Sequence, residues 1–356
     1  MDVNSIPQLI RERSIEVAQS EEFLSFGSTL VNLGVTGHPK HGLQKGSYCL
    51  LVGGSNSGKT WLGLSLIAEA AHNELFDSYS LVYNGPEDGA KMDVQKCFGK
   101  KTKDRIQLLT PGDGASASPE EFYDHLDDTM KEGPTVYILD SMDALMPKDD
   151  EEQQLKERKA RETGKEASGS YGTAKAKINS QRLRAANAEA SKTGSILVII
   201  CQVRDNIGFG SQFKPEVRGG GRALEFYAQT QIWLKKKQSI DRPYKGIQEQ
   251  VGAITQAKIK RTRFTGRETD VEFPIYFSAG LDDFESCIHY LIKYKHWKGD
   301  KTKVVAPEFN HSGTIDRLAQ EISNNPKFVI RLRKITAATW NMVEEHIKVE
   351  RKGRYE

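Results

Sequence analysis

The sequence predicts an α/β protein in which helices flank both faces of a twisted, mostly parallel sheet. Two observations support this fold class. From about residue 46, short apolar runs alternate with segments whose apolar residues recur at helical spacing. A glycine-rich GxxxxGK[ST] motif also stands between the first apolar run and the helical segment that follows it. Strands are expected at 47–53, 79–84, 105–109, 134–140 and 195–202, and helices at 59–73, 89–98, 118–131 and 173–191.

The two ends of the chain follow other patterns. Residues 5–24 carry apolar side chains at helical spacing with charges between them, which predicts a short amphipathic helix that needs a partner surface. After residue 228, three strand-like segments at 229–237, 252–264 and 269–278 follow one another, as expected of antiparallel additions to one sheet edge. The predicted organisation is an N-terminal subunit-linking segment (1–30), a core (31–282) and a small helical C-terminal domain with a basic end (283–356).

Two segments inside the core fit neither pattern. Residues 147–172 are almost free of aliphatic side chains, and residues 204–221 are rich in glycine. Loops of this length are uncommon inside a compact domain and are usually functional or disordered. Both are expected to be irregular.

Composition restricts the functional classes. The 356 residues carry a formal net charge of only +3, so local clusters must indicate the partners. The four cysteines are far apart and form no CxxC pair, which argues against a metal or disulfide framework. No apolar run approaches the ~18 residues of a membrane span. We therefore expect a protein of the cytosol, the host cytosol if it is phage-encoded, with no membrane partner.

The glycine-rich motif predicts a phosphate site. Its backbone amides would surround the phosphates, Lys59 would contact the β- and γ-phosphates, and the Thr60 hydroxyl would hold Mg²⁺. A carboxylate is also needed for the metal, and Asp140 follows a buried run directly, with Ser141 after it. The expected cofactors are therefore ATP and Mg²⁺. The residues expected to bind them are Gly53, Gly54, Ser55, Asn56, Ser57, Gly58, Lys59, Thr60, Asp140 and Ser141, with Thr60 and Asp140 as the metal site.

Hydrolysis also needs a group that orients the attacking water. Glu87 and Asp88 end the second expected strand, and Glu87 is the candidate general base with Asp88 as its competitor. Gln202 ends a near-continuous apolar run, so it would emerge at the carboxyl edge of a parallel sheet, where ligands bind. From there it could sense the γ-phosphate and pass that state to the glycine-rich segment after it.

In this order the motifs resemble the RecA-type recombinase family, the phage UvsX-like members included. The similar stretches are the phosphate motif, "LDSMDALMPK", "IICQVRDNIG" and "GGRALEFYAQTQIWLKKK", within residues 24–280. The resemblance implies a RecA-like P-loop NTPase core whose two irregular segments bind single-stranded DNA. The implied DNA contacts are Arg204, Ile207, Phe209, Phe213 and Arg218 in the second segment, with Lys156 and Arg158 in the first. A solvated charged loop is the alternative for the first segment.

The resemblance also assigns Arg261 and Arg263 as cations that reach the ATP of the neighbouring subunit. Together with Lys59, Glu87 and Gln202 they complete the expected catalytic set. An exposed cationic edge strand that discourages aggregation is the alternative. Where the family carries an adenine-stacking aromatic residue, this chain has Val94, so base recognition must differ.

These residues imply an ATP-dependent DNA recombinase that forms a helical filament on single-stranded DNA, pairs it with duplex DNA and exchanges strands. A single-strand-binding protein and a mediator or loader are possible further partners. The alternatives are a hexameric DNA helicase or translocase and an ATP-switched accessory scaffold that binds single-stranded DNA. The appearance of the assembly on DNA and a strand-exchange assay would discriminate between them.

Overall fold

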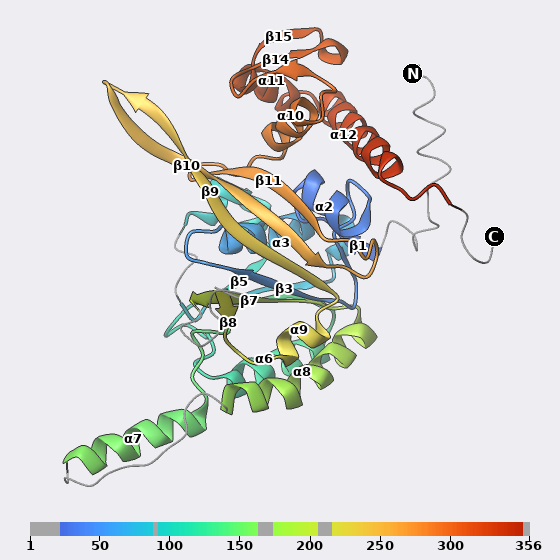
Figure 1. Cartoon of the computed structure of the whole chain (residues 1–356). Coiled ribbons are helices and arrows are strands. Elements are labelled where there is room, and N and C mark those ends of the chain that lie inside the picture. Colours follow the sequence, from blue (N-terminus) through green and yellow to red (C-terminus); the bar gives the residue numbers. More distant parts are fainter. Residues whose placement is uncertain (1–21, 88–91, 163–173, 206–215, 352–356) are drawn as a thin grey trace.

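A computed structural model describes residues 22–87, 92–162, 174–205 and 216–351 (Figure 1). Across these residues, ten strands form one sheet in the order β12-β11-β10-β9-β3-β7-β6-β4-β5, with β8 paired to β7. The ladders that join β9, β3, β7, β6, β4 and β5 are all parallel. The expected α/β fold with a mostly parallel sheet is confirmed.

The elements of the core follow the alternation seen in the sequence. The strands of the sheet are β3 (Tyr48–Gly53), β4 (Ser80–Asn84), β5 (Ile106–Leu109), β6 (Thr135–Asp140), β7 (Ile196–Asp205), β8 (Glu216–Arg218), β9 (Thr230–Tyr244), β10 (Ile247–Arg261), β11 (Thr269–Tyr276) and β12 (Gly280–Leu281). The helices are α2 (Thr29–Thr36), α3 (Lys59–Ala71), α4 (Val94–Phe98), α5 (Lys100–Arg105), α6 (Pro119–Glu132), α7 (Lys148–Glu162), α8 (Ala174–Thr193) and α9 (Ala223–Tyr227), and a 3-10 turn η3 spans Glu74–Phe76. Two short strands, β1 (Phe23–Leu24) and β2 (Leu43–Gln44), pair with each other. The expected N-terminal helix lies almost wholly outside the described residues.

Helices cover both faces of the sheet, as expected (Figure 1). Successive side chains of a strand point to opposite faces. In β3, Cys49 and Leu51 pack in the cluster that contains α2 and α3, while Leu50 and Val52 pack with α6, α8 and α9. Near-continuous apolar strands therefore reflect burial on both faces.

The strands after residue 228 differ from the prediction in one respect. β9 pairs in parallel with β3, with Gly53 opposite Leu234, so it continues the parallel sheet rather than adding an antiparallel strand. β10 and β11 are antiparallel, as expected. The chain turns between β9 and β10 through Lys245 and Gly246, whose φ angles are 50° and 84°. Such a two-residue turn with positive φ matches the twist of a hairpin, and the hairpin extends beyond the sheet (Figure 1).

The first expected loop is largely a helix, which corrects the prediction for 147–172. Lys148–Glu162 forms α7, which projects from the body of the molecule (Figure 1). The segment has few aliphatic residues but is rich in good helix formers, and its first turn is acidic, which the helix dipole favours. Lys156 pairs with Glu152 and Arg158 with Glu162, each at i,i+4 spacing. These local interactions favour a helix in a segment that has no apolar face.

The second loop also begins later than expected. β7 passes Gln202 and runs to Asp205, because β8 folds back and pairs with it antiparallel, Val203 opposite Arg218. The extra strand supplies hydrogen-bond partners beyond the sheet. Residues 206–215 lie outside the described part of the chain.

The C-terminal unit has its own apolar core and contains more than helices. Its helices are α10 (Asp283–Lys293), α11 (Ile315–Ser323) and α12 (Pro326–His346). The strands β13 (Lys298–Gly299), β14 (Lys303–Ala306) and β15 (His311–Thr314) form a small antiparallel sheet, with a 3-10 turn η4 (Pro307–Phe309). The strands are too short for a periodicity signal, so the sequence predicts only the helices. Ile288, Leu291, Trp297 and Leu318 are among the buried side chains that join both parts.

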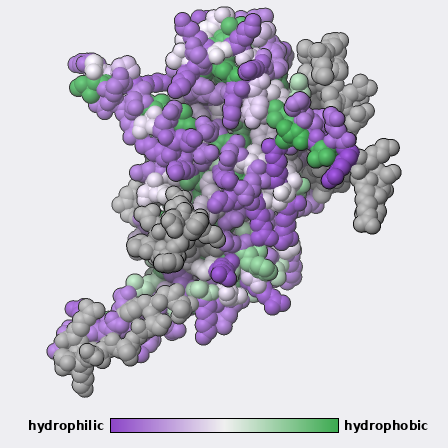
Figure 2. Space-filling model, viewed as in Figure 1, coloured by the Kyte–Doolittle hydropathy of each residue, from purple (hydrophilic) through white to green (hydrophobic). Residues whose placement is uncertain are grey.

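The face seen in Figure 2 is mainly hydrophilic. A small hydrophobic patch lies at the tip of the β9–β10 hairpin, where Ile247 is 62% exposed. Within the described residues, none of the helices combines the length and the apolar character needed to cross a membrane.

Candidate nucleotide-binding site

Strands distant in sequence bring the candidate site residues to one edge of the sheet. Gly53 ends β3 opposite Gln202 of β7, and Asp140 ends β6 opposite Ile200. β4 ends nearby at Asn84, and Glu87 follows it in the next turn. Since all four strands are parallel, their carboxyl ends meet at the same edge.

The phosphate motif folds as a tight loop between β3 and α3. Gly58 precedes the helix with φ at 91°, a conformation that favours glycine. A Cβ on Gly53 would lie 2.5 Å from both the carbonyl oxygen of Leu234 and Ser57 Oγ, so only glycine fits. Ser57 Oγ is buried and has no hydrogen-bond partner among the residues that the structure describes. A loop with an unsatisfied hydroxyl at the positive end of a helix fits an anionic ligand.

Lys59 is held inside this loop. Its Nζ donates to the carbonyl oxygens of Gly53 and Gly54, at 2.8 and 2.6 Å. Burial lowers the pKa of Lys59, and the nearby charges of Asp140 and Glu87 oppose that shift. The buried ammonium group thus donates only to neutral carbonyl oxygens in these two hydrogen bonds. Charged phosphate oxygens would be stronger acceptors.

Thr60 and Asp140 lie together, as their proposed metal role requires. Thr60 Oγ1 donates to Asp140 Oδ2 at 2.6 Å, and the Tyr83 hydroxyl donates to the same oxygen. Burial, then the negative charge of Asp140, raises the pKa of Tyr83 well above its ordinary value. The phenol thus stays protonated and orients the carboxylate. A hydroxyl and a carboxylate oxygen beside a phosphate loop fit Mg²⁺, which prefers oxygen ligands and retains several waters.

Glu87 and Gln202 contact each other directly. Gln202 Nε2 donates to both carboxylate oxygens of Glu87, at 3.0 and 2.8 Å, and the Ser141 hydroxyl donates to one of them. The backbone NH of Gln202 donates to Asp143 Oδ2 at 2.7 Å, which ties β7 to the turn after β6. The competing acid, Asp88, lies outside the described residues.

The expected DNA-contact residues fall in two places. Arg204 and Arg218 lie on β7 and β8, which flank the undescribed residues 206–215. Ile207, Phe209 and Phe213 lie outside the described residues. Lys156 and Arg158 lie on α7, where their side chains are 78% and 80% exposed. Exposed ion pairs contribute little to stability, so both cations can exchange a carboxylate for a phosphate.

Arg261 and Arg263 lie far from the phosphate loop of their own chain along the strand direction. β10 runs antiparallel to β9, and Arg261 is opposite Gln231, near the start of β9, whereas Leu234 is the β9 residue beside Gly53. Arg261 Nη1 donates to the carbonyl oxygens of Glu225 and Phe226, at 2.9 and 3.3 Å. Both arginines are exposed.

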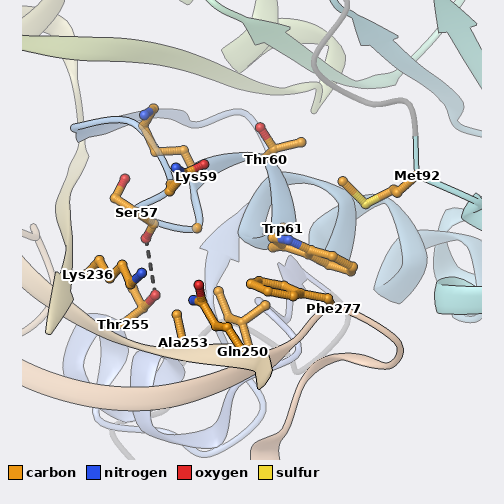
Figure 3. A pocket seen from close by; sticks show the side chains of 13 residues that line it. Ser57, Lys59, Thr60, Trp61, Met92, Lys236, Gln250, Ala253, Thr255 and Phe277 are labelled. Atoms are coloured by element: carbon orange, nitrogen blue, oxygen red, sulfur yellow. Dashed lines mark hydrogen bonds between the residues drawn. The ribbon is translucent and has the colours of Figure 1, made fainter. Parts of the chain in front are cut away.

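A cavity of about 320 Å³ adjoins the phosphate loop (Figure 3). Trp61 and Phe277 line it, and sequence reasoning missed both. The tryptophan directly after Lys59 and Thr60 was the available signal. Val94, at the position where the resemblance placed an aromatic residue, is 8% exposed in α4.

The chain belongs to a known family by comparison of its sequence. The model of the family described as "RecA N-terminal domain" matches residues 4–282. This chain is a member of the RecA family. The match includes every strand of the RecA-type core from β1 to β12 and ends where the C-terminal unit begins.

RecA proteins of bacteria are among its relatives. The chain is 29% identical to "Protein RecA" of Rickettsia canadensis over 244 residues, which is 67% of this chain and 62% of that protein. It is 26% identical to "Protein RecA" of Geobacter sulfurreducens over 318 residues, which is 88% of this chain and 83% of that protein. The matched region thus spans less than two thirds of the Rickettsia relative.

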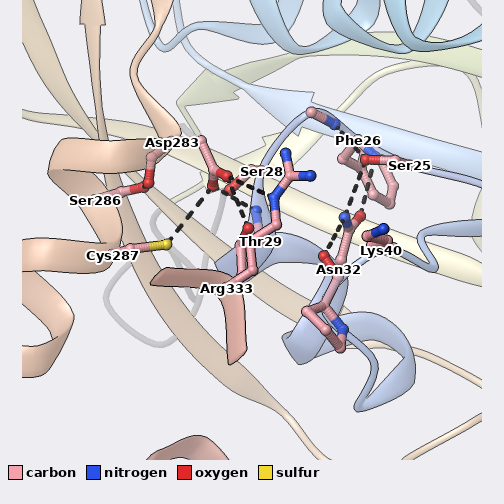
Figure 4. Close-up of polar contacts among 12 residues, drawn as sticks. Ser25, Phe26, Ser28, Thr29, Asn32, Lys40, Asp283, Ser286, Cys287 and Arg333 are labelled. Carbon is pink, nitrogen blue, oxygen red and sulfur yellow. Dashed lines mark hydrogen bonds and ion pairs between the residues drawn. The ribbon is translucent and has the colours of Figure 1, made fainter. Parts of the chain in front are cut away.

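A second polar region joins the RecA core to the C-terminal unit (Figure 4). The buried Asp283 accepts hydrogen bonds from the backbone NH and the hydroxyl of Thr29, at 2.6 and 2.7 Å. Arg333 of α12 lies 3.8 Å from the same carboxylate. Burial raises the pKa of Asp283, and Arg333 opposes the shift. This network fixes α10 and α12 against α2.

His38 and His41 lie in the turn after α2, beside this network, and we expect His38 to make the stability of the protein depend on pH. The rings of His38 and His41 stack with centroids 3.6 Å apart. Burial first, then the charges of His41 and Lys40, lowers the pKa of His38 to about 4. The unfolded chain protonates this histidine near its ordinary pKa of about 6.5. The neutral His38 therefore contributes its full stabilisation above its ordinary pKa of about 6.5, and this contribution is lost as the pH falls toward 4.

We expect His38→Gln to remove part of this loss. Urea unfolding at about pH 7.5 and about pH 5 should show the wild type losing ~1 kcal/mol more than the variant, a value reduced because the ring is partly exposed. Equal losses in the two proteins would contradict the assignment to His38.

Proposed function

We propose that this protein is an ATP-dependent DNA recombinase that polymerises on single-stranded DNA and promotes homologous pairing and strand exchange. One observation carries the proposal: the hydrogen bonds between Glu87 and Gln202. They join the residue expected to act on water to β7, which ends at Asp205, directly before segment 206–215. A change at the γ-phosphate is thereby coupled to the expected DNA segment.

The proposed chemistry is hydrolysis of ATP at the edge of the sheet. Lys59 and the loop amides would hold the phosphates, and Thr60 and Asp140 would hold Mg²⁺, which when bound neutralises charge on the phosphates. Glu87 would orient the attacking water and accept its proton. When Gln202 turns to the γ-phosphate, it releases the Glu87 carboxylate for that task. Ser141 keeps the carboxylate in place meanwhile.

The proposed polymer follows from the position of the two arginines. Arg261, the last residue of β10, and Arg263, just beyond it, would meet the nucleotide bound by the adjacent subunit, so hydrolysis would depend on assembly. Arg204 and Arg218, together with Ile207, Phe209 and Phe213, would contact DNA through phosphates and stacked bases, and Lys156 and Arg158 of α7 would add phosphate contacts. Backbone and stacking contacts tolerate any sequence, so we expect little sequence preference.

We place the protein in the cytosol, that of the host if a phage encodes it, where it would act on single-stranded and duplex DNA. A single-strand-binding protein and a mediator that loads the filament are further proposed partners.

The test is ATP turnover with and without single-stranded DNA, combined with electron microscopy and a strand-exchange assay. DNA-stimulated turnover, helical filaments and exchanged strands are the expected results. Closed rings that translocate would favour a hexameric helicase. Binding of single-stranded DNA with neither turnover nor exchange would favour an accessory scaffold.

A further inference from the structure

The cavity beside the phosphate loop has a position and lining that suit the base of a nucleotide. Ser57, Gly58 and Thr60 are among the residues that line it, so the cavity adjoins the proposed phosphate site. At about 320 Å³ it has room for a purine and its ribose. The following inference rests on the proposed binding of ATP.

One wall of the cavity is aromatic. Trp61 and Phe277 both line the cavity, and Figure 3 shows their rings on the side away from Lys236. Phe98 packs against the indole of Trp61, with ring centroids 5.7 Å apart. A Cβ on Gly280 would lie 3.4 Å from the same indole. Trp61 is therefore held in place by its neighbours.

The exposure of Phe277 is the stronger indication of a ligand at this wall. Its side chain is 51% exposed, although it is large and apolar, and it follows β11 directly. A single exposed aromatic residue is unremarkable on a protein surface, but this one faces a cavity with an aromatic partner and a phosphate loop. Stacking of a nucleotide base on such rings is favourable and requires no particular base.

Stacking alone does not distinguish one base from another, but the side-chain amide of Gln250 can do so through a hydrogen bond. Its Nε2 donates to the carbonyl oxygen of Gly252 at 3.0 Å. Because that carbonyl can only accept, the orientation of the Gln250 amide is determined. Its Oε1 accepts no hydrogen bond from the described part of the chain. This oxygen points toward the phosphate-loop side of the cavity (Figure 3). Thr255 Oγ1, on the same strand, donates to the carbonyl oxygen of Ser57 at 3.2 Å and fixes β10 against the loop.

An acceptor at this position discriminates between the two purines. The 6-amino group of adenine can donate to Gln250 Oε1, whereas the 6-oxo group of guanine would place one acceptor against another. We propose that the nucleotide base stacks on Trp61 and Phe277 and that Gln250 selects adenine over guanine. Lys236, at the other side of the cavity, would meet the ribose or phosphates rather than the base.

The test measures binding rather than turnover. Calorimetric titration of the full chain with MgATP and MgGTP should show that Gln250→Leu weakens ATP binding about tenfold and leaves GTP binding unchanged. Gln248→Leu, an exposed glutamine of β10 outside the cavity, is the matched control and should change neither. An unaltered preference for ATP in Gln250→Leu would overturn the selection.

The stacking wall is tested by two variants of one residue. Trp61→Leu should weaken ATP and GTP binding alike, by about tenfold, while Trp61→Tyr, which keeps a ring, should retain most of the affinity. Full affinity in a folded Trp61→Leu protein would overturn the stacking. If Trp61→Leu fails to fold, loss of ATP quenching of tryptophan fluorescence in Trp61→Tyr replaces it, and undiminished quenching there would count against the proposal.

Failure of the inference differs from failure of the proposed function. Strand exchange by the wild type together with an unchanged base preference in Gln250→Leu would refute the inference alone. Adenine selection that depends on Gln250, in a wild type that exchanges no strands, would support the inference and refute the recombinase.

Discussion

Glu87→Gln is expected to lower DNA-stimulated ATP turnover by about a hundredfold or more while ATP binding is unchanged. The substitution keeps the shape of the side chain and one acceptor oxygen. Gln202 and Ser141 both donate to Oε1 of Glu87, so an oxygen at that position can still be held by both. It removes the negative charge that accepts a proton from water. Filaments formed with ATP should persist, because release depends on hydrolysis. Steady-state kinetics with single-stranded DNA and negative-stain microscopy measure the two effects.

Two further variants make this experiment specific. Glu74→Gln changes an exposed carboxylate in η3, outside the nucleotide-binding site, and should leave turnover unaltered. Asp88→Asn tests the competing acid in the same turn. If Asp88→Asn abolishes turnover and Glu87→Gln does not, the general base is Asp88 and the role proposed for Glu87 is wrong.

Replacing Arg261 and Arg263 together by alanine is expected to lower turnover about a thousandfold, as for other cations supplied in trans to a phosphate. Single-stranded DNA binding should weaken as well, because ATP would no longer join the subunits. Loss of Arg261 also removes its hydrogen bonds to Glu225 and Phe226, so thermal unfolding must be compared with the wild type. Arg317→Ala, an exposed arginine of α11, is the control.

Mixing two inactive proteins shows whether the arginines act between subunits. In a random filament of Glu87→Gln and the double arginine variant, about a quarter of the interfaces combine an intact Glu87 with intact arginines. Turnover of about that fraction is expected. If the mixture is as inactive as its components, the arginines do not act in trans, and the edge-strand alternative gains support.

Most of the candidate site could be predicted because parallel strands share a direction. Gly53 and Gln202 are far apart in sequence, yet each ends or nearly ends an apolar run, and the structure pairs them. Asp140 follows the same rule. The direct contact of Gln202 with Glu87 could not be predicted from the sequence, because it depends on the path of the turn at Gly85 and Pro86.

Other features had no reliable local signal. The charged segment that forms α7 lacks apolar periodicity, which is the usual sign of a helix, and it is stabilised instead by helix formers and i,i+4 pairs. β9 resembles its neighbours in sequence, and only its pairing with β3 makes it parallel. Short strands such as β13 give no pattern at all.

By itself the sequence determined the alternating α/β fold, the phosphate loop and the acids and amide at the strand ends, because each of these depends on neighbouring residues or on the direction of a strand. Only the tertiary structure decided which side chains face the cavity. Trp61, Gln250 and Phe277 come from three separate elements, and their meeting depends on how β10 and β11 pack beside α3. That arrangement is a property of the folded sheet, so no local pattern could reveal it.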